Sequence, residues 1–222
     1  MLTFHIITLF PEAVQPYLDA SIIGRAQKEK KIAVKYYNPR DFTTNKFRSV
    51  DGRPYGGGPG MIIAVEPILS TIKKIKLKKG GKAKTIIFSP GGKQFDNKMA
   101  KNYGQKYTDL ILICGRYEGI DSRVKKILKA EELSIGPFVL SGGEVPAMVV
   151  VDAMARQIPG VLGNDASPEE NRVSSHEMYT RPEIYIHNNK RYRVPKVLLS
   201  GHHKQIDSWK LKEQSLKRKA KV

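Results

Sequence analysis

Cysteine is nearly absent from this sequence, because Cys114 is the only one among 222 residues. A single cysteine excludes an intrachain disulfide and a zinc site built from several cysteines of one chain. It ends the apolar run Leu110–Cys114, so we expect a buried thiol in a strand. Histidine is also scarce, and His202 and His203 are adjacent rather than four residues apart, as two ligands on one helix face would be. The sequence therefore gives little support to metal chemistry.

Long apolar runs and negative charge are also lacking. No segment approaches the roughly 18 apolar residues of a membrane span, and the first residues show no signal-peptide pattern, so we expect a cytoplasmic protein with no membrane partner. Asp and Glu number 21 against 39 Lys and Arg, a formal charge of +18. This excess favours a polyanionic partner, most simply nucleic acid. The alternative is a generally lysine-rich proteome, in which runs such as Lys73–Lys79 are only solvated.

Several common catalytic motifs are missing. Gly56–Gly60 is not followed by the Lys-Ser/Thr of a P-loop, and no Gly-x-Gly-x-x-Gly follows a predicted strand. No serine lies in a nucleophile-elbow pattern. These absences argue against ATP binding, a dinucleotide site and serine hydrolase chemistry.

Short apolar runs alternate with helical patterns along most of the chain. This alternation predicts an α/β fold with a largely parallel sheet. The predicted strands are residues 2–7, 32–37, 61–64, 85–88 and 110–114. Turn-rich composition then predicts one domain over residues 1–160, a linker over 161–172, and a small, mainly helical domain over 173–222 that ends in a helix from His203 to about Lys219.

Three glycine-rich segments are predicted where strands end: Ser89–Gly92, Gly115–Gly119 and Gly136–Gly143. The carboxyl edge of a parallel sheet is where α/β proteins bind ligands. The third segment encloses the apolar Phe138–Leu140 and leads into a predicted buried helix, Pro146–Ala155. We interpret the three segments as a ligand pocket built from loops, with ordinary strand–helix connections as the alternative.

Six motifs, in this order, resemble those of the bacterial tRNA (guanine-N1)-methyltransferase family TrmD, of the SPOUT superfamily. They are Arg53–Met61, Leu112–Asp121, Ser134–Ala147, Ile158–Gly163, Tyr179–Glu183 and Leu199–His203. The resemblance implies a SPOUT-type parallel sheet with a C-terminal trefoil knot. It also implies an obligate homodimer with the active site at the subunit interface.

The resemblance implies S-adenosylmethionine as methyl donor, with magnesium as a candidate second cofactor. The positions that match the family's cofactor site are Ser89, Pro90, Gly115, Tyr117, Glu118, Gly119, Ile135, Gly136, Pro137, Phe138, Val139, Leu140, Gly142, Gly143 and Pro146. The family more often has Asp-Tyr where this chain has Pro137-Phe138. The change removes one hydroxyl contact and one backbone donor, which would alter cofactor affinity without preventing binding.

The implied substrate is the guanosine at position 37 of a tRNA anticodon loop, methylated at N1. Arg156 matches the family arginine that stabilises negative charge developing toward O6; otherwise it would serve the helix dipole. The tRNA contacts expected from the resemblance are Arg48, Arg53, Tyr179, Arg181, His202, His203 and Lys210. The chain ends sooner than is usual in the family, and the lysines of residues 210–221 are expected to add phosphate contacts.

The general base is the main departure from the family pattern. Asn171 lies where the family has the aspartate base, and an amide cannot accept the proton from N1. Glu170 or Glu169 is the first candidate substitute, and water or Asp165 is the second. The remaining possibility is a weakly active or non-catalytic tRNA-binding homologue.

Overall fold

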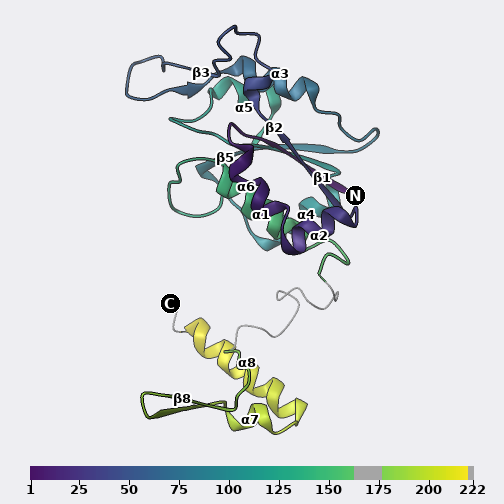
Figure 1. The fold of residues 1–222 in the computed structure, drawn as a ribbon, viewed down its shortest axis with the longest axis vertical. Coiled ribbons are helices and arrows are strands. Elements are labelled where there is room, and N and C mark those ends of the chain that lie inside the picture. Colours follow the sequence, from purple (N-terminus) through teal and green to yellow (C-terminus); the bar gives the residue numbers. More distant parts are fainter. Residues whose placement is uncertain (163–176, 220–222) are drawn as a thin grey trace. The chain divides into compact units, whose positions relative to one another are not determined.

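The protein is described from a computed structural model, in residues 1–162 and 177–219, with side chains to residue 212. The chain divides into two compact units, one within Met1–Gly163 and the other within Asn164–Val222 (Figure 1). Each unit is described by itself.

The larger unit is built on a five-stranded parallel sheet in the order β2-β1-β6-β5-β7. The strands are β1 (Leu2–Ile7), β2 (Ile32–Tyr37), β5 (Ala83–Gln94), β6 (Asp109–Ile113) and β7 (Glu131–Ser134). All five residues of the central β6 are buried, as expected for a strand covered on both faces. The predicted α/β class with a parallel sheet is confirmed.

Helices cover both faces of this sheet (Figure 1). One face packs against α1 (Gln15–Leu18), α2 (Ser21–Lys28), α4 (Asn97–Lys106) and α6 (Glu144–Ala155). The other packs against α3 (Val65–Lys74) and α5 (Ser122–Leu128). Shorter elements are the 3-10 turns η1 (Pro11–Ala13) and η2 (Pro39–Asp41) and the antiparallel pair β3 (Asp51–Gly52) and β4 (Ile62–Ile63). Two apolar cores therefore form, one on each side of the sheet.

The prediction that a strand ends at Phe88, with a turn at Ser89–Gly92, is wrong. β5 continues to Gln94, and both Phe88 and Lys93 pair with Leu133, so residues 89–92 form a bulge within the strand. The reason is the partner strand β7, which the sequence pattern does not indicate because Glu131 and Glu132 interrupt its apolar character. A Cβ at Gly92 would lie 2.7 Å from the carbonyl carbon of Glu132, so this bulge requires glycine.

The smaller unit contains a β-hairpin and two helices. The hairpin is β8 (Ile184–His187) and β9 (Lys190–Arg193), followed by α7 (Lys196–Leu199) and α8 (His203–Lys219). The predicted final helix is confirmed, whereas the hairpin was not predicted. No helix of the described residues is both long and apolar enough to cross a membrane.

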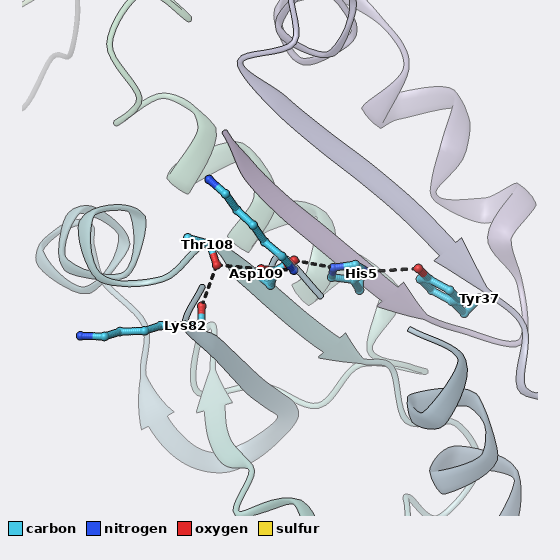
Figure 2. Close-up of polar contacts among 6 residues, drawn as sticks. His5, Tyr37, Lys82, Thr108 and Asp109 are labelled. Atoms are coloured by element: carbon cyan, nitrogen blue, oxygen red, sulfur yellow. Dashed lines mark hydrogen bonds and ion pairs between the residues drawn. The ribbon is translucent and has the colours of Figure 1, made fainter. Parts of the chain in front are cut away.

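A buried polar network crosses three strands of the sheet, from the start of β6 to the end of β2 (Figure 2). His5 is fully buried, and its Nε2 lies 3.0 Å from Oδ1 of Asp109 while its Nδ1 lies 3.1 Å from the Tyr37 hydroxyl. Burial lowers the pKa of His5 by more than the nearby Asp109 carboxylate raises it. Burial also raises the pKa of Tyr37. The imidazole is therefore neutral, with Nε2 donating to Asp109 and Nδ1 accepting from Tyr37.

Asp109 is the charged member of this network. Burial acts to raise its pKa, but hydrogen bonds from His5, from the Thr108 hydroxyl at 2.7 Å and from the Lys78 backbone N–H at 3.3 Å leave the pKa lowered. The carboxylate thus joins β1 and β6 to the turn that precedes β5.

We predict that acid destabilises the protein through His5. Because the folded-state pKa of His5 lies below its ordinary value, the unfolded chain binds the proton more readily. The free energy of unfolding should therefore fall as pH decreases from about 7 to about 5, by at most about 1.4 kcal/mol per pH unit from this one site. Asp109 adds a second loss below its ordinary pKa of 3.8.

Urea unfolding followed by circular dichroism across this pH range measures the dependence. His5→Asn should flatten it, while the matched change at an exposed histidine, His187→Asn, should leave it unaltered. An equal slope in wild type and His5→Asn would contradict the assignment.

Candidate functional site

A pocket of about 280 Å³ lies at the carboxyl edge of the sheet, close to the lower end of the range for small-molecule sites, about 300–1,000 Å³. Its walls are the β5 bulge, the loop after β6, and the segment from the end of β7 to the start of α6. The lining residues are Phe88, Ser89, Pro90, Gly115, Arg116, Tyr117, Glu118, Gly119, Leu133, Ser134, Ile135, Gly136, Phe138, Val139, Leu140, Ser141, Gly142, Gly143 and Pro146.

The structure brings together every cofactor-site residue expected from the sequence except Pro137. Pro137 is exposed and does not line the pocket. Five lining residues were not predicted: Phe88, Arg116, Leu133, Ser134 and Ser141. Arg116 and Ser141 lie inside the glycine-rich motifs, so extending each motif to all its residues would have found them. Ser134 is the first residue of the motif Ser134–Ala147 and would have been found in the same way, whereas Phe88 and Leu133 depend on the β5–β7 pairing, which the sequence pattern does not indicate.

The pocket depends on close contact between its second and third loops. The backbone N–H of Gly143 donates to the carbonyl of Gly115 at 2.9 Å. A Cβ at Gly143 would lie 2.6 Å from Cα of Cys114 and 3.0 Å from the nitrogen of Gly115, so no larger residue fits here without backbone movement. Tyr117 adopts φ +59°, the left-handed region that a side chain rarely occupies, which marks the second loop as strained.

A buried carboxylate holds the two loops together. Glu144, in the first turn of α6, is only 4% exposed. Its Oε1 accepts a hydrogen bond from the Thr8 hydroxyl at 2.7 Å, and its Oε2 lies 3.0 Å from Nε of Arg116. The Arg116 guanidinium also lies over the Phe10 ring, 4.6 Å from its centroid. Arg116 is therefore fixed at the pocket wall from two sides.

Cys114 lies close to Glu144 and Arg116, and both charges act on its thiol. It is buried, and burial together with the Glu144 charge raises the pKa of its thiol. The predicted burial of the thiol is confirmed, but Cys114 follows Ile113, the last residue of β6, rather than lying in the strand. A protonated, inaccessible thiol is no nucleophile, so the chemistry of the pocket must come from other groups.

Arg156 lies far from the pocket of its own chain. It is the C-cap residue of α6, whose other end starts at the pocket with Gly143 as N-cap. At 1.5 Å per residue the helix separates the two positions by roughly 18 Å. The Arg156 Nε is buried and has no hydrogen-bond partner among the described residues. This nitrogen is therefore an unsatisfied donor within the described part of the chain.

The other predicted site residues occupy separate places. Arg48 and Arg53 are exposed in the larger unit, and Arg48 lies 3.9 Å from the Asp41 carboxylate. In the smaller unit, Arg181, His202 and His203 are exposed, Tyr179 donates its hydroxyl to Glu177 at 2.7 Å, and Lys210 lies 3.9 Å from Asp207. Asn171 and its candidate substitutes Glu170, Glu169 and Asp165 lie outside the described residues.

Comparison with known proteins decides the family. The sequence model of the family described as tRNA (Guanine-1)-methyltransferase TrmD matches residues 2–222. The chain belongs to the TrmD family. It is 46% identical over 215 residues to the tRNA (guanine-N(1)-)-methyltransferase of Carboxydothermus hydrogenoformans, covering 95% of this chain and 81% of the relative. The proteins of the same name from Photobacterium profundum and Pasteurella multocida are each 46% identical, over 94% and 96% of this chain and 83% and 86% of theirs.

Membership in the TrmD family confirms the resemblance inferred from the six motifs. Two of those motifs, Leu112–Asp121 and Ser134–Ala147, supply most of the residues that line the pocket. A methyltransferase family implies S-adenosylmethionine as methyl donor.

We predict that Gly143→Ala destabilises the larger unit by about 1–3 kcal/mol, because the added methyl group meets the backbone of Cys114 and Gly115. Gly104→Ala is the matched control: Gly104 lies in α4 with nothing within 4 Å of its added Cβ, and it should stabilise by up to about 1 kcal/mol. Thermal unfolding of the two variants measures the difference. Equal melting temperatures would mean that the two loops are not in the contact described.

Proposed function

We propose that this TrmD-family chain transfers a methyl group from S-adenosylmethionine to N1 of guanosine 37 in the anticodon loop of tRNA. The observation that carries the proposal is the family match over residues 2–222, joined to a pocket whose second and third loops lie in two of the matching motifs. The excess of basic residues, with a formal charge of +18, agrees with an RNA substrate.

The pocket has the residues that S-adenosylmethionine requires. Phe138, Val139 and Leu140 supply an apolar cover for the adenine ring. The glycine loops present backbone N–H and C=O groups that a side chain would otherwise screen. The Glu118 carboxylate and the Ser89 and Ser141 hydroxyls provide acceptors and donors for ribose and the amino-acid end. When bound, the cofactor supplies an electrophilic methyl group on a sulfonium ion.

The reaction requires two further groups at guanine. Guanine N1 carries a proton at neutral pH. The electron pair of N1 can form the bond to the methyl carbon only as a general base removes that proton. The electrons of the broken sulfur–carbon bond stay on sulfur. We assign Arg156 to the negative charge that develops toward O6, because its buried Nε has no partner among the described residues. Glu170 is our candidate base in place of the aspartate that Asn171 replaces.

This assignment requires a second copy of the chain. Arg156 lies roughly 15 Å along α6 from Pro146, the last residue of this helix that lines the pocket, so the two cannot act together within one subunit. The third pocket loop and α6 expose apolar side chains that fit a subunit interface: Phe138, Val139, Leu140, Val145 and Val149 are 39–82% exposed. We therefore propose a homodimer in which Arg156 of one subunit faces the pocket of the other.

The trefoil knot implied by the family belongs to the same proposal. Its support is the return of the segment after β7 to the end of β6, where Gly143 bonds Gly115 and packs on Cys114. A pocket bounded by a knotted crossing would keep its loops together without a disulfide.

The expected tRNA contacts, Arg48, Arg53, Tyr179, Arg181, His202, His203 and Lys210, remain part of the proposal, and so does a cytoplasmic location, where tRNA is modified. Among the described residues no group of three His, Cys, Asp or Glu side chains could hold a metal ion. The proposal therefore takes no step through magnesium.

The activity is tested by methyl transfer from labelled S-adenosylmethionine to two tRNA transcripts. One has G at positions 36 and 37, and the other differs only at position 37. We expect label in the first and none in the second. Binding of both ligands without transfer would instead support the alternative, a non-catalytic tRNA-binding homologue.

The base assignment predicts opposite effects at two neighbouring positions. Glu170→Gln should lower the single-turnover rate by about 100-fold or more, the usual contribution of general-base catalysis. Asn171→Asp should restore transfer in the Glu170→Gln background. An unchanged rate in Glu170→Gln would remove Glu170 as the base.

The composite site is tested by mixing two inactive variants. Arg156→Ala keeps its pocket, and Ile135→Arg, a change at a pocket residue outside the proposed interface whose loss of cofactor binding is measured separately, keeps its Arg156. Random reassortment gives one intact site in half of the dimers, so we expect about a quarter of wild-type activity. If dimer exchange is verified and no activity is recovered, Arg156 of one subunit does not complete the pocket of the other.

A further inference from the structure

The β8–β9 hairpin is a regular element of the smaller unit that no part of the proposed chemistry uses. Its two-residue turn is Asn188-Asn189, with φ of +47° and +60°, the conformation that matches the twist of two antiparallel strands. The Val194 N–H donates to the Glu183 carbonyl at 3.0 Å and closes the open end. In Figure 1 the turn of this hairpin extends away from α7 and α8.

The strand register sorts its side chains onto two faces. Tyr185 lies opposite Tyr192, and His187 lies opposite Lys190, so these four side chains share one face, here called the tyrosine face. Ile184, Ile186, Arg191 and Arg193 lie on the other face. Tyr185 and Tyr192 are 61% and 50% exposed. A soluble hairpin gains little from two aromatic rings left in water, so their exposure requires a reason.

The rings are open to a ligand in the described structure. Neither hydroxyl has a hydrogen-bond partner and neither ring contacts another aromatic ring, among the residues described. A cation lies beside one of them: Nζ of Lys190 is 5.6 Å from the Tyr192 ring centroid. Residues 184–193 carry Lys190, Arg191 and Arg193 and no acidic residue.

Exposed aromatic rings flanked by cations match the chemistry of single-stranded nucleic acid. A base stacks on the ring, and an adjacent phosphate meets a cation on the same face, here Lys190. Duplex RNA keeps its bases stacked on one another and offers only phosphate and sugar to such a surface. A protein or lipid partner would contact the isoleucines as well as the tyrosines. An RNA strand needs only the aromatic rings and the cations.

We propose that the tyrosine face of the β8–β9 hairpin binds unpaired bases of the RNA substrate by stacking on Tyr185 and Tyr192, with Lys190 contacting the adjacent phosphate. This inference rests on the proposed function in taking RNA as the ligand. It adds a site that senses whether a segment of that RNA is single-stranded, apart from the catalytic pocket.

The test measures binding of the full chain to two RNA probes by fluorescence anisotropy. One probe is a single-stranded oligouridine of about ten nucleotides, and the other is an RNA duplex of similar length. The double variant Tyr185→Ile/Tyr192→Ile keeps strand propensity but loses the rings. It should bind the single strand at least tenfold more weakly and the duplex within about twofold of wild type.

Three controls separate stacking from loss of the hairpin. Tyr185→Phe/Tyr192→Phe keeps both rings and should bind the single strand like wild type. Ile186→Thr, on the opposite face, should also bind like wild type. The double Ile variant should keep the wild-type salt dependence, whereas Lys190→Gln should reduce it, because a ring contributes no released counterions and a lysine does.

Unchanged single-strand binding by the double Ile variant, or an equal loss for strand and duplex, would overturn the proposal. Methyl transfer by wild type is measured in parallel. If wild type methylates tRNA while the Ile variant binds the strand normally, the hairpin inference fails and the proposed function stands. If wild type transfers no methyl group while the Ile variant loses strand binding, the proposed function fails and the stacking site stands.

Discussion

The contact between Gly143 and the end of β6 is the constraint on which the candidate site depends. It places the loop after β7 against the loop after β6, with 2.9 Å between the Gly143 nitrogen and the Gly115 oxygen. Because that approach leaves no space for a Cβ, the backbone itself becomes the wall of the pocket. The buried Glu144, held by Thr8 and Arg116, fixes the same junction electrostatically. Burial of this carboxylate is tolerable because Oε1 accepts a hydrogen bond from Thr8 and Oε2 lies 3.0 Å from the positively charged Arg116 guanidinium.

Helix α6 connects this junction to the proposed chemistry. Its inward residues, including Ala147, Val150 and Met154, are fully buried in the core, so the helix is rigidly placed. Its first turn therefore fixes the pocket and its last turn fixes Arg156. A rigid helix keeps these two ends apart, and only a symmetric partner can bring one pocket to another Arg156. Oligomerisation is thus a geometric requirement of the proposed mechanism rather than an addition to its stability.

The sequence predicts the parts of this molecule in which local pattern and tertiary context agree. The strands at residues 2–7 and 32–37 have the predicted bounds, because each is an apolar run with clear ends. The pocket loops were found because glycine is needed where they meet. The β5 bulge and β7 were not, because their pairing depends on residues forty or more positions apart whose own pattern is weak. The hairpin was missed for a different reason: its strands are exposed on both faces, so they lack the apolar alternation by which strands are recognised. Its Asn188-Asn189 turn was the available signal.

The distribution of charge and aromatic side chains separates two requirements of an RNA-modifying enzyme. Lysines spread over a surface attract any polyanion, and their contribution falls with salt whatever the sequence of the RNA. They cannot by themselves select one base. Selection requires a base that has left its stack, since N1 of guanine is engaged in pairing within a helix. A surface that prefers unpaired bases, such as the tyrosine face, would discriminate at the step of binding. The pocket and Arg156 would discriminate at the step of chemistry, and neither step would need to supply the whole specificity.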